Sequence, residues 1–365
     1  MMSDALPLVI LGAGAVTAIG DDVASTCAAM RVKFNNHKET DFTDQDWNPV
    51  VASRAAVDTA LFGEDRLIEM AVSAIKQLFS SLGVEQLSSM PWLLCTPETT
   101  RIGRPANDKA LLDKIAARLG VKLHPASGEL PHGRTAAFLA MVAAQAIFSE
   151  GQNEQVLLLA TDSLVDADGL ADLEEKGILL TPEIPHGFIP GEAAAALLLT
   201  PDQRIKAPSA SPQRLRMVFD SAAFTMTDPD AIPMQSRADA THRKPIPVDG
   251  LELATAIDMA CEQSHCTPED ITVRLADCNG TEAGFKESGL AEARAFQSSD
   301  KLPPLWLPAE CLGEVGAAFV PLSIVWAWHA AIKGYLPGQA MAWPLIHTTN
   351  ADGLRGAAVF RVEEL

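Results

Sequence analysis

The feature that most constrains this chain is a pattern of elements that occurs twice along it. Each series opens with a strand (VILGAG, MVFDSA), has a second strand that ends in cysteine and a polar residue (WLLCTP, RLADCNG), and closes with an apolar strand (AAAALLLT, GAAVFRV). A long alanine-rich helix, expected at residues 134–150 and 313–334, comes before each closing strand. The two series share little residue identity, so the repeat lies in the elements.

Apolar strands that alternate with helices predict mixed, largely parallel sheets with helices on both faces. Two such halves packed together predict an α/β chain with five layers, α/β/α/β/α. A chain of 365 residues is long enough for one duplicated unit of this kind. We place the halves at residues 1–205 and 206–365 and expect them to form one compact unit.

The charge of the chain argues against two classes of function. Its 47 acidic and 28 basic residues give a net charge of −19, whereas nucleic-acid binding needs a basic face and anionic membranes repel acidic chains. We therefore expect no nucleic acid and no membrane among its partners. An acidic carrier protein would need a local basic patch, which two stretches could supply, although solvated connector charges are the simpler interpretation. The stretches are Arg204, Lys206, Arg214 and Arg216, and Arg237, His242, Arg243 and Lys244.

Cysteine spacing and apolar runs bear on cofactors and location. The six cysteines include no CxxC pair and no metal-ligand spacing, and the glycines of VILGAGAVTAIG lack dinucleotide-loop spacing, so we expect no metal and no cofactor. The N-terminal apolar run has no basic residue before it and is interrupted by glycines, which is typical of a strand and turn. The apolar run at 317–332 is too short to span a bilayer. These features predict a cytoplasmic protein with reduced thiols.

Two motifs in the sequence resemble those of the β-ketoacyl synthases. VILGAGAVTAIGDDV is similar to their opening strand and G-x-G-x-V-(T/S)-x-x-G turn. GFIPGEAAAALLLT, residues 187–200, is similar to their "dGFvpGEGAaalvL" segment, with Ala193 where the family usually has glycine. With the matching halves, the resemblance covers most of the chain and implies a duplicated thiolase-like fold. For Glu192 in the second motif, anchoring of turn amides is a simpler role than catalysis.

The resemblance also locates the three positions at which the family carries its catalytic cysteine and two histidines. The cysteine position falls at Arg134, within one or two residues, at the head of the first long helix. CNGTEAG places Asn279 at the first histidine, and AECLGEVGAAF places Gly313 or its neighbour at the second. Arginine cannot attack a thioester, and asparagine can donate a hydrogen bond to an oxyanion but cannot exchange protons near neutral pH. We therefore expect that the family's condensation does not occur here.

Three nearby residues are weaker candidates for a residual thioester chemistry. His132 and Thr135 flank Arg134, but a threonine nucleophile needs a base held beside it. Cys278 ends a strand in a place equivalent to Cys95 of the first half, and packing is the more ordinary role for such thiols. Arg134 itself is unfavourable at a positive helix end unless an acidic neighbour or an anionic ligand compensates it.

The family members pair two subunits across a central strand, which the resemblance places near QVLLLATDS. We accordingly expect a homodimer, or a heterodimer with an active ketosynthase in which this chain is similar to a chain-length-factor subunit that shapes the acyl tunnel. An acyl carrier protein is a further expected partner of such a complex. One alternative is an adaptor, because thiolase-like proteins without catalytic residues occur among accessory genes of type VI secretion loci. Another is residual binding or transfer of an acyl thioester.

Overall fold

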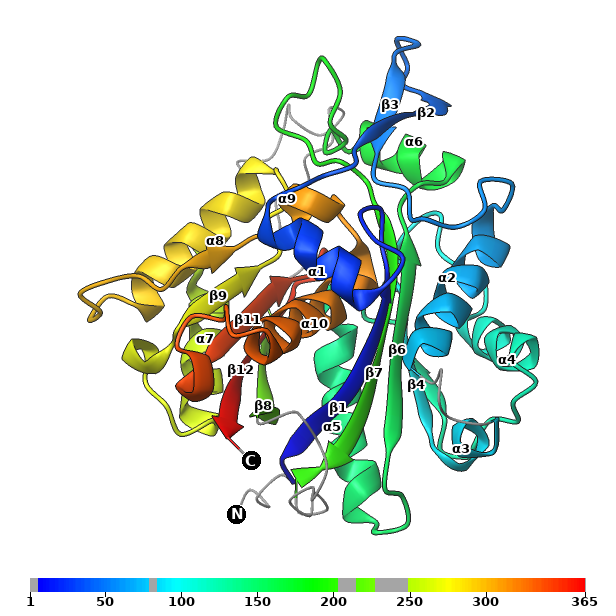
Figure 1. Cartoon of the computed structure of the whole chain (residues 1–365). Coiled ribbons are helices and arrows are strands. Elements are labelled where there is room, and N and C mark those ends of the chain that lie inside the picture. Colours follow the sequence, from blue (N-terminus) through cyan, green and yellow to red (C-terminus); the bar gives the residue numbers. More distant parts are fainter. Residues whose placement is uncertain (1–5, 79–83, 203–214, 227–248, 365) are drawn as a thin grey trace.

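The computed structural model describes residues 6–78, 84–202, 215–226 and 249–364 (Figure 1). The described strands are β1 Leu8–Val16, β2 Lys38–Thr43, β3 Pro49–Ala52, β4 Trp92–Cys95, β5 Gly128–Leu130, β6 Val156–Ser163, β7 Glu192–Pro201, β8 Leu215–Met226, β9 Val273–Ala276, β10 Leu305–Trp306, β11 Pro344–Thr349 and β12 Leu354–Glu364. The described α-helices are α1 Val23–Arg31, α2 Gly63–Leu78, α3 Val84–Ser89, α4 Asp108–Arg118, α5 Ala136–Ser149, α6 Ala167–Glu175, α7 Leu251–Gln263, α8 Glu282–Ala295, α9 Ala309–Leu312 and α10 Phe319–Ile332.

Ten of these strands form a sheet in which the same strand order occurs twice. The order is β10-β9-β11-β12-β8-β1-β7-β6-β4-β5, so β5-β4-β6-β7-β1 and β10-β9-β11-β12-β8 are the same arrangement in the two halves. The halves meet where β1 and β8 pair antiparallel over two residue pairs, Leu8 with Phe219 and Val9 with Val218. The sheet is mixed, as expected. Its parallel pairs lie toward the two outer edges, and the strands around the junction are antiparallel.

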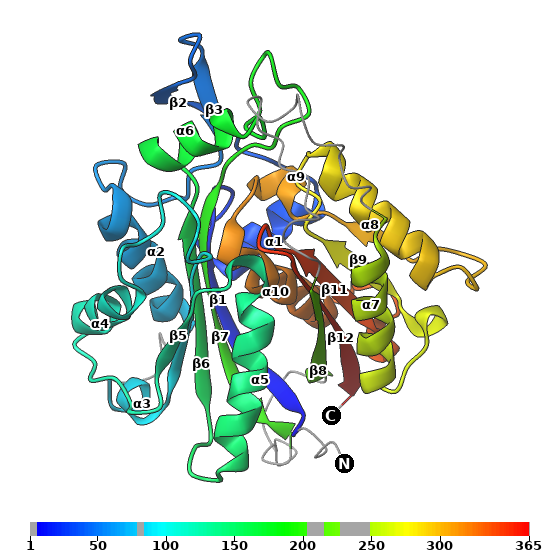
Figure 2. The same ribbon diagram turned by 180° about the vertical axis from the view of Figure 1, so that it is seen from behind.

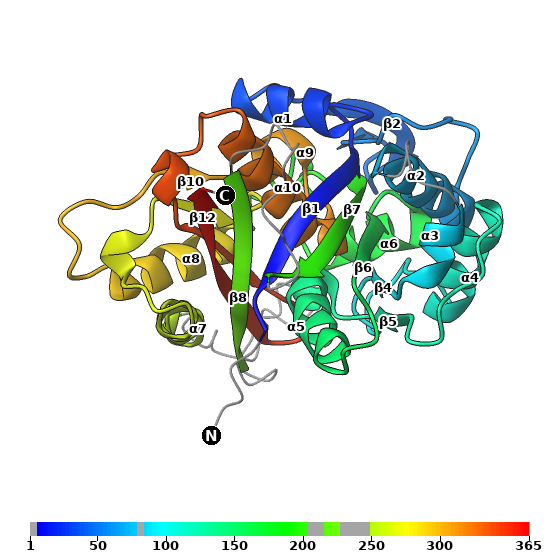
Figure 3. The ribbon, with the colours of Figure 1, turned by 60° about the horizontal axis from the view of Figure 1, so that its bottom comes forward.

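The helices divide into an inner pair and two outer sets, which gives the five expected layers (Figures 1 and 2). α5 and α10 contact strands of both halves and each other, so they form the middle layer. α2 covers the outer face of β1, β7 and β6 with α4 beside it, and α7 covers the outer face of β8 and β12 with α8 beside it. The view in Figure 3 shows β1 and β8 side by side where the halves join.

Burial explains why these segments take these positions. Every residue of β7, EAAAALLLTP, is buried, as a strand with helices on both faces requires. α10, FVPLSIVWAWHAAI, is buried along most of its length and is apolar nearly all round, which is typical of a helix between two sheets. α2 has a one-sided apolar face because one side contacts the sheet and the other faces solvent.

The structure corrects two details of the sequence-based expectations. The long helices do not begin at Arg134 and Gly313: short 3-10 turns at Gly133–Thr135 and Gly316–Ala318 come first, and the α-helices follow. The segment QVLLLATDS cannot be the strand that pairs across a subunit interface, because it forms β6, whose two edges are already hydrogen bonded to β4 and β7.

Other expectations fall outside what the structure describes. The boundary between the halves at residues 205–206 lies outside the described residues, as do most of the basic residues of the two stretches. Arg216 is described, and it is paired with Asp202 and Glu363. None of the described helices combines the length and apolar character that crossing a bilayer requires.

Glu192, at the start of β7, anchors a neighbouring turn. Its carboxylate is 1% exposed and accepts hydrogen bonds from the Ala55 amide (2.8 Å), Arg66 Nε (2.7 Å) and Ser163 Oγ (3.0 Å). Arg66, on α2, is 3% exposed, so the two charges neutralise each other in the interior. The pair ties α2 and the turn after β3 to the central strand β7.

We predict that Glu192→Leu lowers the free energy of unfolding by about 3–5 kcal/mol, because it leaves the Arg66 guanidinium buried without its carboxylate. The double variant Glu192→Leu with Arg66→Met removes both charges, and its free energy of unfolding should fall clearly less than that of the single variant. Urea unfolding followed by circular dichroism measures both. A loss below about 1 kcal/mol for the single variant would show that the pair does not hold this layer.

Candidate functional site at the heads of the two central helices

The positions singled out by the sequence gather where α5 and α10 begin. The 3-10 turn that carries Arg134 lies against the turn that precedes α10. Each turn starts with a glycine at positive φ, Gly133 (53°) and Gly316 (52°). A Cβ at Gly133 would lie 2.2 Å from the Glu98 carboxylate, and one at Gly316 would lie 2.0 Å from Asp162 Oδ2. The glycines therefore let an acidic side chain reach each helix head, where the helix dipole favours negative charge.

Arg134 is held by acidic residues from the other half of the chain. Its Nη1 lies 2.8 Å from Asp277 Oδ2, at the end of β9, and its Nε lies 3.4 Å from Glu314 Oε1. Burial by itself would lower the pKa of the guanidinium, but Glu314, Asp277 and Glu98 together raise it above its ordinary value. Arg134 is therefore a permanent cation, and acidic neighbours compensate it at the helix head.

Asp277 is fixed by β11 as well as by Arg134. Its Oδ2 accepts hydrogen bonds from Thr348 Oγ1 (2.7 Å) and the Thr349 amide (2.8 Å), and the residue is 8% exposed. With Arg134 and the Thr349 hydroxyl (3.4 Å), this oxygen has four donors, and the carboxylate cannot move toward a substrate without losing them.

Asn279 is already engaged with Glu314. Its Nδ2 donates to Glu314 Oε2 (2.5 Å), and its Oδ1 accepts from Thr281 Oγ1 (3.1 Å). One of the two N–H donors of this amide is thus taken by Glu314, whose negative charge also opposes an oxyanion at this place.

Gly313 has no room for a side chain. It adopts a φ of 68°, and a Cβ there would lie 2.6 Å from the Ile189 carbonyl oxygen. A histidine at this position would therefore need the backbone to move. The neighbouring Glu314 reaches the site instead.

Thr135 and His132 do not form a nucleophile and base. Thr135 is fully buried, and its hydroxyl donates to the His132 carbonyl oxygen (2.9 Å) and accepts from Asn350 Nδ2 (2.9 Å). The side chain of His132 is exposed. The hydroxyl proton thus points to a backbone oxygen and not to a base, which leaves the threonine without the partner that activation requires.

The thiols of Cys278, of Cys95 in the equivalent place, and of Cys311 in α9 are protonated at neutral pH. Cys278 is 3% exposed, and burial, followed by the nearby Asp277 charge, raises its pKa to about 12. Burial alone raises the pKa of Cys95 far above its usual range, and burial with Glu310 raises that of Cys311 to about 11. A thiol that stays protonated is a poor nucleophile.

A second ion pair closes the head of α10. Arg101 binds Asp162 with two hydrogen bonds, Nη1 to Oδ2 (2.9 Å) and Nη2 to Oδ1 (2.6 Å). Burial raises the pKa of Asp162, and Arg101 opposes that shift. With Arg134, this pair places two guanidinium groups and four carboxylates, those of Glu98, Asp162, Asp277 and Glu314, around the two helix heads.

The backbone amides at the helix heads are occupied by side chains. An oxyanion site needs preorganised N–H groups that are free to bind the oxyanion. Here a side-chain oxygen accepts a hydrogen bond from each of three such backbone amides. These three N–H groups are therefore not free to bind an oxyanion. The bonds are Thr135 N to Asn350 Oδ1 (3.3 Å), Gly316 N to Glu314 Oε1 (2.9 Å) and Ala317 N to Asp162 Oδ2 (2.7 Å).

Sequence reasoning missed most of the acidic partners in this site. Two local signals were available: Asp277 directly precedes Cys278 in the ADCNG motif, and Glu314 is the neighbour of Gly313. No signal pointed to Glu98 or to Asp162 as partners of guanidinium groups, because they meet them only through the packing of separate strands.

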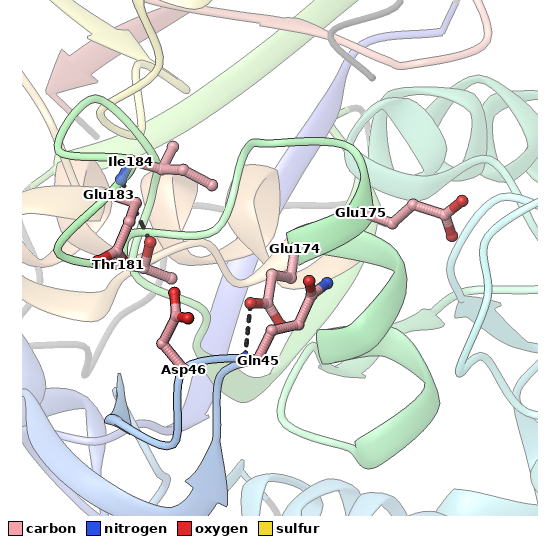
Figure 4. Close-up of a pocket in the computed structure, with 7 residues that line it drawn as sticks. All are labelled: Gln45, Asp46, Glu174, Glu175, Thr181, Glu183 and Ile184. Atoms are coloured by element: carbon pink, nitrogen blue, oxygen red, sulfur yellow. Dashed lines mark hydrogen bonds between the residues drawn. The ribbon is translucent and has the colours of Figure 1, made fainter. Parts of the chain in front are cut away.

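A hollow of about 180 Å³ lies elsewhere, between the β2–β3 hairpin, α6 and the loop before β7 (Figure 4). Acidic side chains dominate its lining, and Glu174 Oε1 accepts from the Gln45 amide (2.8 Å). Within the described residues, no group of three or more His, Cys, Asp or Glu side chains is arranged to hold a metal ion. The lining residues are Gln45, Asp46, Glu174, Glu175, Thr181, Glu183 and Ile184.

We predict that iodoacetamide at neutral pH leaves Cys278, Cys95 and Cys311 of the folded chain unlabelled. A pKa of about 12 for Cys278 means roughly a thousand-fold less thiolate than a free cysteine has. Peptide mass spectrometry measures the labelling, and the chain unfolded in urea, where these thiols must react, is the control. Rapid alkylation of folded Cys278 would identify a reactive nucleophile and contradict this site description.

Comparison with known proteins adds a structural likeness. No family model matches the sequence, and no curated protein matches it. The fold is similar to chains of three solved ketosynthase complexes, each over 98% of this chain. The first is AntDE:AntF, a type II ketosynthase complex with its acyl-carrier protein (TM-score 0.75, 15% identity, 99% of that chain covered). The second is the ishigamide ketosynthase/chain length factor (TM-score 0.70, 17% identity, 99% of that chain covered). The third is the ketosynthase ApeO with its chain length factor ApeC from Xenorhabdus doucetiae (TM-score 0.68, 12% identity, 98% of that chain covered).

At identities of 12–17%, what these proteins share with this chain is the fold. The likeness covers 98% of this chain and 98–99% of each matched chain. The chain therefore has the thiolase-like fold of ketosynthases and chain length factors.

Proposed function

We propose that this chain is a non-condensing ketosynthase-like subunit that works by pairing with a second thiolase-fold chain, as a chain length factor pairs with its ketosynthase. The observation that carries the proposal is the guanidinium of Arg134 at the head of α5, tied to Asp277 and Glu314. It stands where the resemblance places the nucleophile. The surrounding amides and carboxylates are saturated by one another, so the site is suited to holding the two halves together.

A pairing surface lies close to this site. Among the described strands, β5 lies at the edge of the sheet and pairs with β4 alone, so its other edge can take up a strand of a partner chain. α5 contacts β5 and lies in the foreground of Figure 2. Five of its apolar residues form a stripe that is half-buried or exposed. We call these residues the α5 stripe: Leu139, Val142, Ala143, Ala146 and Ile147.

The spacing of the α5 stripe is that of one helix face. Val142 is 38% exposed, which is unusual for a large aliphatic residue in a helix that otherwise packs into the middle layer. A second chain that extended the sheet at β5 would cover this stripe and bury it. We therefore place the pairing at β5 and α5, in place of β6.

The described surface gives little support for direct docking of an acidic carrier protein. The chain carries a net charge of −19, and the described member of the basic stretches, Arg216, is paired with Asp202 and Glu363. In the proposed complex, carrier contact falls to the active partner. Residual thioester transfer by this chain would need a nucleophile, and the geometry of Thr135 and Cys278 does not provide an activated one.

We predict that the chain forms a complex through the α5 stripe. Light scattering should give about 78 kDa for a homodimer, twice the 38.8 kDa of one chain, or a heterodimer when the chain is co-expressed with a cysteine-bearing ketosynthase encoded beside it. Val142→Glu should abolish the complex, because it places a charge in an apolar interface. Met341→Glu, at an 80% exposed apolar residue on the other half, is the matched control and should have no effect.

A chain that stays monomeric alone and with the ketosynthase, or a complex that survives Val142→Glu, would contradict the proposal. Capture of a secretion-system component through the same stripe would favour the adaptor role instead. A longer product from the ketosynthase when this chain is present would support the chain-length role.

We also predict that restoring a cysteine does not restore chemistry. In Arg134→Cys, the carboxylates of Glu314, Asp277 and Glu98 should raise the pKa of the new thiol, and the amides at the helix head remain occupied. Incubation with an acyl thioester should therefore give no acyl adduct by intact mass, with an active ketosynthase as positive control. An acyl adduct on the variant or on the unaltered chain would overturn the view that this site is not catalytic.

A further inference from the structure

The end of α7 brings two cysteines together in a defined turn. The Cys266 amide donates to the Cys261 carbonyl oxygen (3.0 Å), and the His265 amide donates to that of Glu262 (3.1 Å). His265 is left-handed, with a φ of 54°. This pair of bonds defines a Schellman motif. A contact commonly accompanies the motif, between the side chain of the third-last helical residue and that of the second residue after the C-cap. Those two side chains here are Cys261 and Cys266.

Packing agrees with the backbone geometry. Cys261 is 3% exposed and belongs to the apolar cluster between α7, α8 and the sheet, and Cys266 is a half-buried side chain that packs against the same cluster. Cys261 thus has a thiol neighbour that is partly open to solvent. α7 lies on the outer side of the sheet, so small reagents can reach the turn from solvent (Figure 2).

The two thiols differ in acidity. Hydrogen bonding from the Cys261 thiol lowers the pKa of Cys266, although burial and the charges of Asp270 and Asp220 oppose the shift. The same interaction, with burial, raises the pKa of Cys261. Burial raises the pKa of the four other cysteines. Cys266 therefore differs from the rest in both exposure and acidity.

We propose that Cys261 and Cys266 are a reversible oxidation site, at which a hydroperoxide such as hydrogen peroxide converts the dithiol to an intrachain disulfide. The Cys266 thiolate attacks one peroxide oxygen, the O–O bond breaks, and hydroxide leaves, which gives a sulfenic acid. The Cys261 thiol then attacks that sulfur, the S–S bond forms, and water leaves. In sum, two thiols and one peroxide give one disulfide and two waters. A thiol reductant reverses the reaction by exchange.

The disulfide would lock a turn that exists before oxidation. It closes a loop of six residues, Cys261 to Cys266, around a left-handed turn that the backbone bonds already hold. α7 packs against β8, β12 and α8, so oxidation fixes the end of the helix that covers the outer face of the second half. The fold should persist in both redox states.

The test uses the full chain and peptide mapping. Trypsin releases both cysteines on one peptide, residues 244–274, because no other Lys or Arg occurs within it apart from Lys244 before proline. After hydrogen peroxide and an alkylating quench, we expect this peptide to lose two hydrogens and both alkyl groups, and a reductant to restore them. Before oxidation, Cys266 should alkylate at least about tenfold faster than the buried cysteines.

Three variants make the result decisive. Cys266→Ser should abolish oxidation of the peptide, and Cys261→Ser should leave a sulfenic acid on Cys266 that dimedone traps. Cys311→Ser is the matched control at a buried cysteine and should leave the disulfide intact. The proposal would be overturned if the peptide remained fully reduced after peroxide. It would also be overturned if Cys266 oxidised at the same rate and to the same product in the unaltered chain and in the Cys261→Ser variant.

Discussion

The interaction on which the site depends is the bond between Arg134, at the head of α5, and two carboxylates of the other half, Asp277 and Glu314. Arg101 and Asp162 come from the first half, and Asp162 accepts from the Ala317 amide of the second. The charges at the helix heads therefore join the halves. Removing one member would leave partly desolvated charges unpaired, which is costly in a protein interior.

The same network supports the proposal that this chain does not carry out the family's condensation. In an acyl-transfer site the helix head must offer an ionised nucleophile and free amides. Here a guanidinium occupies the position that the resemblance gives to the nucleophile. Side-chain oxygens of Asn350, Glu314 and Asp162 accept hydrogen bonds from the backbone N–H groups at the helix heads. The residues of the site also depend on one another. Because Gly133 has no side chain, the Glu98 carboxylate can lie beside it, where it helps to neutralise Arg134. In the proposed function, the site is a structural junction between the two halves.

The position of the proposed pairing surface follows from the duplicated sheet. A sheet that is duplicated and joined at β1 and β8 leaves its free edges at β5 and β10. β5 lies beside the half-exposed stripe of α5, so the place where a partner can add a strand is next to the modified helix head. At the opposite, outer layer of the second half, the Cys261–Cys266 turn offers a separate point at which the chain can respond to oxidants.

The sequence alone determined the repeated order of elements and the layered α/β fold, because burial periodicity and local motifs are properties of short segments. It also gave, through the resemblance, the expectation that Arg134, Asn279 and Gly313 stand at the family's catalytic positions. It did not determine that β6 is an interior strand, that the helices start with 3-10 turns, or that Glu314 and Asp277 hold Arg134. The strands that pair with β6 lie tens of positions away along the chain, and the two acidic partners of Arg134 lie more than a hundred positions away. Only the tertiary structure decides such contacts, since they arise from how separate segments pack and not from the segments themselves.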